Sequence, residues 1–198
     1  MPLKWKRPRR IFVNSMSDLF HESLTNEQIA AVFGVMAAAP QHTFQCLTKR
    51  ARRMREWFEW AVSQRGQVGD ARSVCSQAAA ALVGRKWDFA LGDGSWPLPN
   101  VWLGVSVEDQ ARADLRIPAL LDTPAAVRWL SCEPLLGPVD LTHMDVERHS
   151  GRNRDMGHPC RDVPKVDWVV VGGESGPAAR PMHPEWARSL RDQCQRAG

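Results

Sequence analysis

Five short apolar segments constrain the fold of this chain more than any other feature of its sequence. Each is rich in Val, Ile, Phe or Trp and nearly uninterrupted by polar residues, and they occupy residues 11–15, 43–48, 101–107, 127–132 and 168–172. Continuous apolar character over so few residues is typical of strands that are buried on both faces of a parallel sheet. Helical patterns separate most of them, so the sequence predicts an α/β fold of about five mainly parallel strands joined by helical crossovers.

Helix signals between the strands support this prediction. Thr25 and Gln28 form a capping-box pattern, and Pro40 limits the helix that follows it. Residues 71–83 are also expected to be helical. The helix after residue 48 has a core-facing stripe at the i, i+3, i+4, i+7 spacing, formed by Met54, Trp57, Phe58 and Ala61.

Two later helices are predicted from their ends. A short helix covers residues 108–116 with Pro118 as its boundary, and the last helix starts at Pro184. The residues of the last helix expected to face the core are Trp186, Leu190 and Cys194. We expect one incomplete, barrel-like domain over residues 1–198, with irregular insertions near residues 63–98 and 134–164.

Positive charge is concentrated in two runs. The chain has 26 Lys and Arg against 22 Asp and Glu, and ten of the positive residues fall within residues 4–10 and 49–55. Such runs are usually solvated faces, and contact with nucleic acid or another anion is the alternative.

The spacing of the cysteines and histidines argues against a disulfide framework and against a metal site. The five cysteines show no CxxC pattern, and the gaps between His143, His149, His158 and Cys160 match no structural zinc spacing. Cys132 follows a strand, but no histidine lies in an assignable partner position. No stretch approaches the ~18 apolar residues of a membrane helix, so we expect no membrane partner and a cytoplasmic location.

Polar residues follow every predicted strand. In parallel folds the carboxyl ends of the strands meet at one edge, where ligands bind, although turn formation alone also selects polar residues. The candidate ligand-binding residues are Asn14, Ser15, Asp18, Thr48, Lys49, Arg50, Ser106, Glu108, Glu133, Gly172, Gly173, Glu174 and Ser175.

Lys49 and Arg50 stand at the start of a helix, where the helix dipole disfavours positive charge by ~0.3–1 kcal/mol per residue. A bound anion or a neighbouring carboxylate such as Asp18 would offset that cost, and solvent exposure is the simpler alternative. We therefore predict an anion site formed by Thr48, Lys49 and Arg50 with Asn14, Ser15 and Asp18. Its ligand would be a phosphate-containing small molecule or a nucleic acid.

Residues 172–176 read Gly-Gly-Glu-Ser-Gly. This segment lets the backbone approach a ligand closely and places Glu174 at a strand tip, which suits an amine or ribose hydroxyls. It matches neither the dinucleotide fingerprint nor the P-loop, and a tight turn explains the glycines equally well.

The strand segments together resemble a known family. The segments that carry the resemblance are residues 4–20, 47–50, 102–108, 131–137, 172–176 and 180–182. They are similar to a phage-encoded family named after gene products thirty-seven and sixty-eight, which looks related to radical S-adenosylmethionine enzymes. The resemblance implies a partial (β/α) barrel with outer helices, S-adenosylmethionine as cofactor, and a phage or prophage origin.

The resemblance also implies what this chain lacks. Family members carry a cysteine-rich loop upstream of the segment that matches residues 4–10, and none of the five cysteines here offers that loop. An iron–sulfur cluster is therefore not expected in this chain. We expect a shortened family member, inactive alone, that pairs through exposed sheet edges. The alternative is a non-catalytic prophage remnant or a nucleic-acid-binding or anion-binding module.

Overall fold

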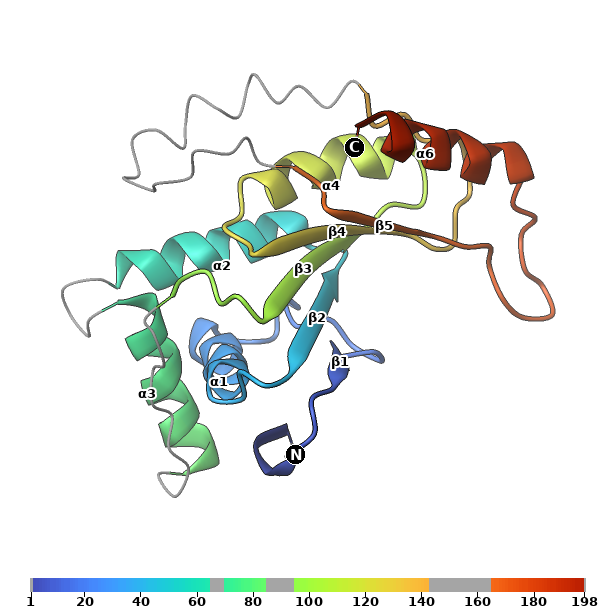
Figure 1. Cartoon of the computed structure of the whole chain (residues 1–198). Helices are drawn as coiled ribbons and strands as arrows, with labels where there is room; N and C mark the ends of the chain where they lie inside the picture. The colour runs from blue at the N-terminus through green and yellow to red at the C-terminus, as the bar shows by residue number, and fades with distance from the viewer. Residues whose placement is uncertain (1, 65–69, 85–94, 143–164, 198) are drawn as a thin grey trace.

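The computed structural model describes residues 2–64, 70–84, 95–142 and 165–197. Its centre is one sheet of five parallel strands whose spatial order follows the chain (Figure 1). The strands are β1 (Arg10–Val13), β2 (Thr43–Thr48), β3 (Val101–Ser106), β4 (Val127–Cys132) and β5 (Trp168–Val171). The sheet is open, with β1 and β5 at its edges, which confirms the predicted α/β fold and is consistent with part of a barrel.

Five α-helices lie on the outer side of the sheet (Figure 1). They are α1 (Asn26–Ala37), α2 (Ala51–Ser63), α3 (Ala71–Val83), α4 (Gln110–Leu121) and α6 (Pro184–Ala197), and a short 3-10 turn, η1 (Pro2–Lys4), precedes β1. The predicted capping box of α1 is present, because Gln28 N–H donates to Thr25 Oγ1 and Thr25 N–H donates to Gln28 Oε1 at 2.9 Å. No described helix is long and apolar enough to cross a membrane.

The core fills the space between the sheet and the outer helices. The predicted stripe of α2 is fully buried, from Met54 to Ala61, and the Trp57 ring stacks on Phe33 of α1 at 4.3 Å between centroids. Burying one large apolar side chain contributes ~1.5–3 kcal/mol. The helical stripe therefore packs α2 into the core beside α1, with its first turn at the carboxyl end of β2.

The prediction for the helix over residues 108–116 is wrong at both ends. Asp109 is the N-cap of α4 and accepts a hydrogen bond from Arg112 N–H at 2.9 Å, so Glu108 precedes the helix. The helix continues past Pro118 because it buries two large apolar residues beyond it, Leu120 and Leu121. Their burial, at ~1.5–3 kcal/mol each, offsets the ~3 kcal/mol that an internal proline costs.

The last helix starts at Pro184 as predicted, but it does not bury Cys194. Leu190 is buried, Trp186 is half-buried, and the buried residue of the final turn is Gln193. The Gln193 side chain donates to Val139 O at 3.0 Å and accepts from Leu141 N–H at 2.7 Å. These bonds satisfy the amide in the interior and leave the adjacent cysteine facing outward.

Candidate functional site

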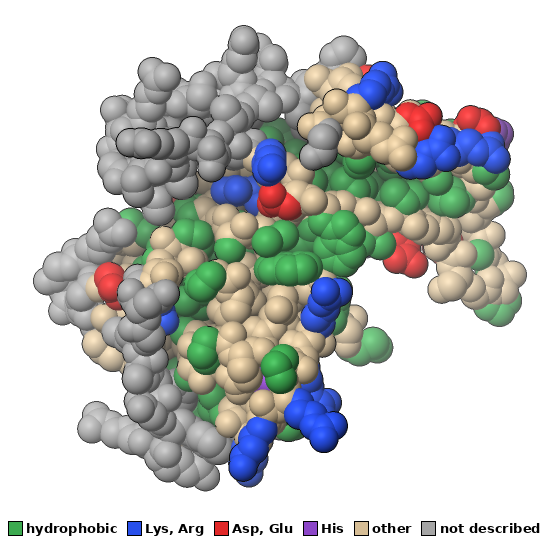
Figure 2. Space-filling view, in the orientation of Figure 1, with side chains coloured by type: hydrophobic (Ala, Val, Ile, Leu, Met, Phe, Trp, Pro, Cys, Tyr) green, Lys and Arg blue, Asp and Glu red, His purple; other side chains and the backbone are tan. Residues whose placement is uncertain are grey.

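The face of the sheet opposite the helices carries a layer of aromatic side chains. We call it the open face. The strand register places on it Arg10, Phe12, Thr43, Gln45, Leu47, Trp102, Gly104, Ser106, Val127, Trp129, Ser131, Trp168 and Val170. None of the described helices lies on this face (Figure 1), and hydrophobic side chains show along the sheet in the space-filling view (Figure 2). Large apolar groups left uncovered in this way mark binding surfaces.

Trp129 lies at the centre of the open face. An added Cβ on Gly104 would come within 2.4 Å of the Trp129 ring, so the indole lies directly on the glycine backbone. The ring centroid is 5.5 Å from that of Trp168 and 6.2 Å from that of Phe12. Trp129 is buried, whereas Trp168 and Phe12 are 41% and 45% exposed.

The Trp129 indole N–H is buried and has no acceptor among the residues that the structure describes. A buried donor without a partner costs ~1–3 kcal/mol. Trp and Tyr donors that are buried normally find an acceptor. The open face therefore combines exposed aromatic rings with one buried hydrogen-bond donor that has no described acceptor.

Polar side chains lie where the strands end, and we call them the carboxyl-end rim. Asp18 connects the ends of β1 and β2: its carboxylate accepts hydrogen bonds from Thr48 Oγ1 at 2.8 Å, from Lys49 N–H at 3.2 Å and from Arg50 Nη1 at 3.1 Å. The predicted anion-site residues Asp18, Thr48 and Arg50 are thus brought together. Asp18 itself supplies the negative charge at the start of α2.

A second ion-pair group spans β2, β3 and α4. Glu108 accepts from Lys49 Nζ at 2.9 Å and from Arg116 Nη1 at 2.8 Å. Burial raises the pKa of Glu108, but the hydrogen bond from Lys49 and the charge of Arg116 outweigh burial, so the pKa lies below its ordinary value. Arg116 also donates to Ser106 O at 2.8 Å, which fixes the end of β3.

Two of these partners were missed in the sequence. Arg116 lies within the predicted helix over residues 108–116, and Glu22, which accepts from Arg50 Nε at 2.9 Å, belongs to no predicted element. Neither residue directly follows a strand, so neither is among the candidate ligand-binding residues. A buried or clustered cation needs a carboxylate partner, and this need is the sequence signal that links Arg116 and Glu22 to the rim.

Glu133 lies at the end of β4 against the turn that follows β5. An added Cβ on Gly172 would come within 2.9 Å of the Glu133 carboxyl group, so only glycine permits this approach. Gly172 is held by two backbone bonds, N–H to Cys132 O at 3.1 Å and O from Leu135 N–H at 2.9 Å. Glu133 is exposed, and its carboxylate has no hydrogen-bond or ion-pair partner within the described ranges.

The Glu174 carboxylate forms an ion pair with Arg180. Arg180 donates to both carboxylate oxygens at 2.8 Å, and Arg180 N–H donates to one of them at 2.8 Å. These side-chain and backbone hydrogen bonds lower the pKa of Glu174 to about 2. Glu174 therefore closes its own turn, which includes Gly176 at φ +111°.

The remaining candidates are divided between the two surfaces. Ser106 and Ser131 are buried side by side at the carboxyl end of the open face, and Gly173 and Ser175 belong to the turn after β5. Asn14 and Ser15 are not drawn into the rim network. Asn14, at φ +58°, donates instead to Ser17 Oγ at 2.9 Å within the exposed turn after β1.

The rim carries more negative than positive charge. Its cations Lys49, Arg50, Arg116 and Arg180 are all paired with carboxylates. The carboxylates are Asp18, Glu22, Glu108, Glu133 and Glu174, of which Glu133 is the one without a described partner. This balance favours a positively charged group over a phosphate.

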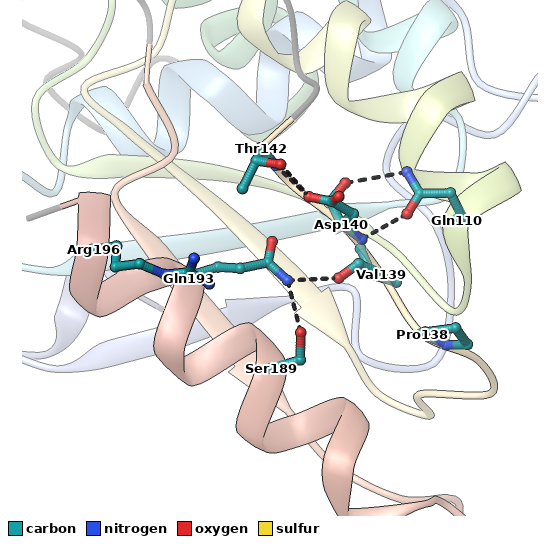
Figure 3. A pocket seen from close by; sticks show the side chains of 8 residues that line it. All are labelled: Gln110, Pro138, Val139, Asp140, Thr142, Ser189, Gln193 and Arg196. Atoms are coloured by element: carbon teal, nitrogen blue, oxygen red, sulfur yellow. Dashed lines mark hydrogen bonds between the residues drawn. The ribbon is translucent and has the colours of Figure 1, made fainter.

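A separate cavity of about 430 Å³ lies between α4, residues 138–142 and α6 (Figure 3). Its polar groups bond to one another: Gln110 donates to Asp114 and accepts from Asp140 N–H, and Gln193 donates to Val139 O. The cavity therefore presents satisfied structural contacts, not reactive groups.

The described cysteines do not form a ligand set. Cys46, Cys75 and Cys132 are buried in β2, α3 and β4, and burial raises the pKa of each thiol to about 12. The described part of the chain contains no group of three His, Cys, Asp or Glu side chains arranged to hold a metal. The histidines of the 134–164 segment and Cys160 lie outside the described residues.

Comparisons with known proteins place the chain in a family. Neither the curated proteins nor the solved structures give a significant match. A family model, in contrast, matches every residue from 1 to 198. The chain belongs to the family described as Protein of unknown function (DUF5131).

Proposed function

We propose that the open face and the carboxyl-end rim bind a small molecule with a planar base and a cationic amine, and that this molecule is S-adenosylmethionine. The observation that carries the proposal is the exposed Glu133 carboxylate on the carboxyl-end rim, which has no partner among the described residues, together with the aromatic rings of the open face. The resemblance of the strand segments to radical S-adenosylmethionine enzymes supports the same ligand, and it supports a phage or prophage origin of the chain.

The aromatic layer suits the adenine and the sulfonium of this ligand. Trp168 is 41% exposed and presents a ring for offset stacking. The buried Trp129 N–H would donate to a ring nitrogen or a ribose oxygen of the ligand once the neighbouring rings move apart. A sulfonium near an indole face is attracted as any cation is, by ~0.5–2 kcal/mol.

Glu133 suits the ammonium group. Its carboxylate is exposed, and its neighbour Gly172 leaves no side chain on that side of it. The excess of carboxylates over cations on the rim disfavours phosphate and favours a ligand whose reactive end is positive. The proposal concerns binding, because the described cysteines do not fit an iron–sulfur cluster and no chemical step is derived through one.

Calorimetric titration with S-adenosylmethionine, adenosine and inorganic phosphate tests the proposal. Glu133→Gln is expected to weaken S-adenosylmethionine binding by about 10-fold or more, since a hydrogen bond to a charged group contributes ~1.5–3 kcal/mol. Adenosine binding should be unchanged in this variant. Glu59→Gln on the outer face of α2 is the matched control, because it removes one exposed carboxylate far from the rim.

The proposal fails if the wild-type protein shows no saturable binding of S-adenosylmethionine up to about 1 mM. A dissociation constant of 1 mM corresponds to a binding free energy of only ~4 kcal/mol. It also fails if Glu133→Gln and Glu59→Gln bind equally well. Tighter binding of phosphate than of S-adenosylmethionine would instead support the anion site predicted around Lys49 and Arg50.

A further inference from the structure

The two basic runs of the sequence have different environments in the structure. In the run over residues 49–55, every cation has a described partner: besides the rim pairs of Lys49 and Arg50, Arg52 pairs with Glu56 at 2.7 Å. Arg53 donates to Asn26 Oδ1 at 2.6 Å, and Arg55 lies 3.4 Å from Asp122. Four of the five cations in this run are therefore paired with carboxylates, and the fifth, Arg53, donates to an amide oxygen.

The run before β1 is not neutralised. Lys6, Arg7, Arg9 and Arg10 are exposed, and none of them has a carboxylate partner among the described residues. Figure 2 shows Lys and Arg side chains without acidic neighbours at the end of the molecule where the N-terminus lies in Figure 1. We call residues 5–10 the amino-end basic segment.

Contacts at both ends hold this segment against the domain. The Trp5 carbonyl accepts from Gln41 Nε2 at 3.1 Å, and the Trp5 ring meets His42 edge-on at 6.1 Å between centroids. Arg9 O accepts from Thr43 N–H at 2.9 Å where β1 joins β2. The cations therefore project from a fixed backbone, which lowers the entropy lost when they bind.

An aromatic ring is exposed within the same segment. Trp5 is 36% exposed, and the Arg9 guanidinium lies 4.7 Å from its centroid. Proteins that bind single-stranded nucleic acid combine cations that follow the phosphates with aromatic rings that stack on bases. A duplex hides its base faces, so the exposed ring favours a single strand.

We propose that the amino-end basic segment binds single-stranded nucleic acid, with Lys6, Arg7 and Arg9 on phosphates and Trp5 stacked on a base. This surface lies at the amino ends of the strands, whereas the rim lies at their carboxyl ends. The proposal uses no residue of the rim, so either proposal can fail without the other. Arg10, the last residue of the segment, lies 6.0 Å from the Trp102 ring of the open face, and the proposal does not use it.

Fluorescence anisotropy with a labelled oligothymidylate of about 12 nucleotides, a site size in the range of single-strand binders, tests the proposal. The dissociation constant is measured between low and physiological salt for the whole chain. Each phosphate contact contributes about 0.7 to the slope of log K against log salt. The variant Lys6→Ala/Arg7→Ala/Arg9→Ala should reduce that slope by about 2 and weaken binding strongly.

A matched control removes the same charge elsewhere. Arg52→Ala/Arg112→Ala/Arg188→Ala removes three exposed, paired arginines and should leave the slope nearly unchanged. Trp5→Leu should weaken binding about 10-fold, because stacking on one base contributes ~1–3 kcal/mol, and should leave the slope unaltered. Circular dichroism establishes that each variant is folded.

Three outcomes would overturn the proposal. The first is an equal loss of oligonucleotide affinity in the two triple variants, which would show that binding depends only on net charge. The second is tighter binding of a duplex of the same length than of the single strand. The third is binding to vesicles of anionic lipid with no measurable binding to oligonucleotide, which would assign the segment to a membrane surface.

Discussion

Replacing Gly104 by Ala tests the packing on which the open face depends. The added methyl group would lie 2.4 Å from the nearest atom of the Trp129 ring, whereas carbon atoms in contact are ~3.5–4.0 Å apart. The indole must therefore move by about 1 Å or more. It cannot do so freely, because its ring also contacts Trp168 and Phe12.

The expected cost of Gly104→Ala is ~1–3 kcal/mol, the range for overpacking a fixed site. Urea unfolding followed by circular dichroism measures it as a lower midpoint with an unchanged slope. Because the displaced ring belongs to the proposed ligand surface, the same variant should also bind S-adenosylmethionine more weakly.

Gly173→Ala is the matched control. Its added methyl group would lie 3.7 Å from Met182 Cβ, an ordinary contact, so stability should stay the same or rise slightly. Combining Gly104→Ala with Trp129→Leu removes the clash, so the double variant should lose less stability than the sum of the single changes. Equal stability of Gly104→Ala and Gly173→Ala would refute the placement of the indole on Gly104.

Other changes test the rim and the thiols. Asp18→Asn should lower the unfolding free energy by ~1–3 kcal/mol in urea, because it weakens bonds to four donors, and Glu22→Gln should change it less. The pKa of Glu108 is lowered in the folded protein, so Glu108 stabilises the fold above pH 4.5, the ordinary pKa of the group, and this stabilisation is lost as pH falls through the lower folded pKa. Unfolding midpoints measured across a pH series should be less sensitive to acid in Glu108→Gln. Cys194 is exposed, whereas the Cys132 thiol is buried with a pKa of about 12. Mass spectrometry after brief iodoacetamide treatment should therefore show one fast-reacting thiol fewer in Cys194→Ser than in the wild type, and the same number in Cys132→Ser.

The strands could be predicted because their signal is local. Residues 43–48 and 127–132 form strands with the predicted bounds. β3 and β5 end one residue earlier than predicted, and β1 starts one residue earlier and ends two residues earlier. Apolar runs of this length have few alternatives once helices lie between them. The prediction that the strands are covered on both faces was less accurate, because Phe12 and Trp168 remain about half exposed on the open face.

The rim could be predicted only in part. Strand ends brought Asp18, Thr48 and Arg50 together, as the parallel topology requires. The partners of the charges depend on helix placement instead: Arg116 reaches back from the second turn of α4 to Glu108, which precedes the helix. Long-range pairing of this kind depends on tertiary packing, which no local spacing records.

The indole N–H signals of the tryptophans test the central claim most directly. The chain has nine tryptophans, and a spectrum of the ¹⁵N-labelled protein resolves their side-chain N–H groups; Trp129→Phe and Trp168→Phe assign the two on the open face. Saturating S-adenosylmethionine should shift the Trp129 signal most, because its N–H gains an acceptor, and the Trp168 signal next. Trp57, buried against α1 on the other side of the sheet, should stay in place. Unchanged Trp129 and Trp168 signals would show that the open face does not bind this ligand.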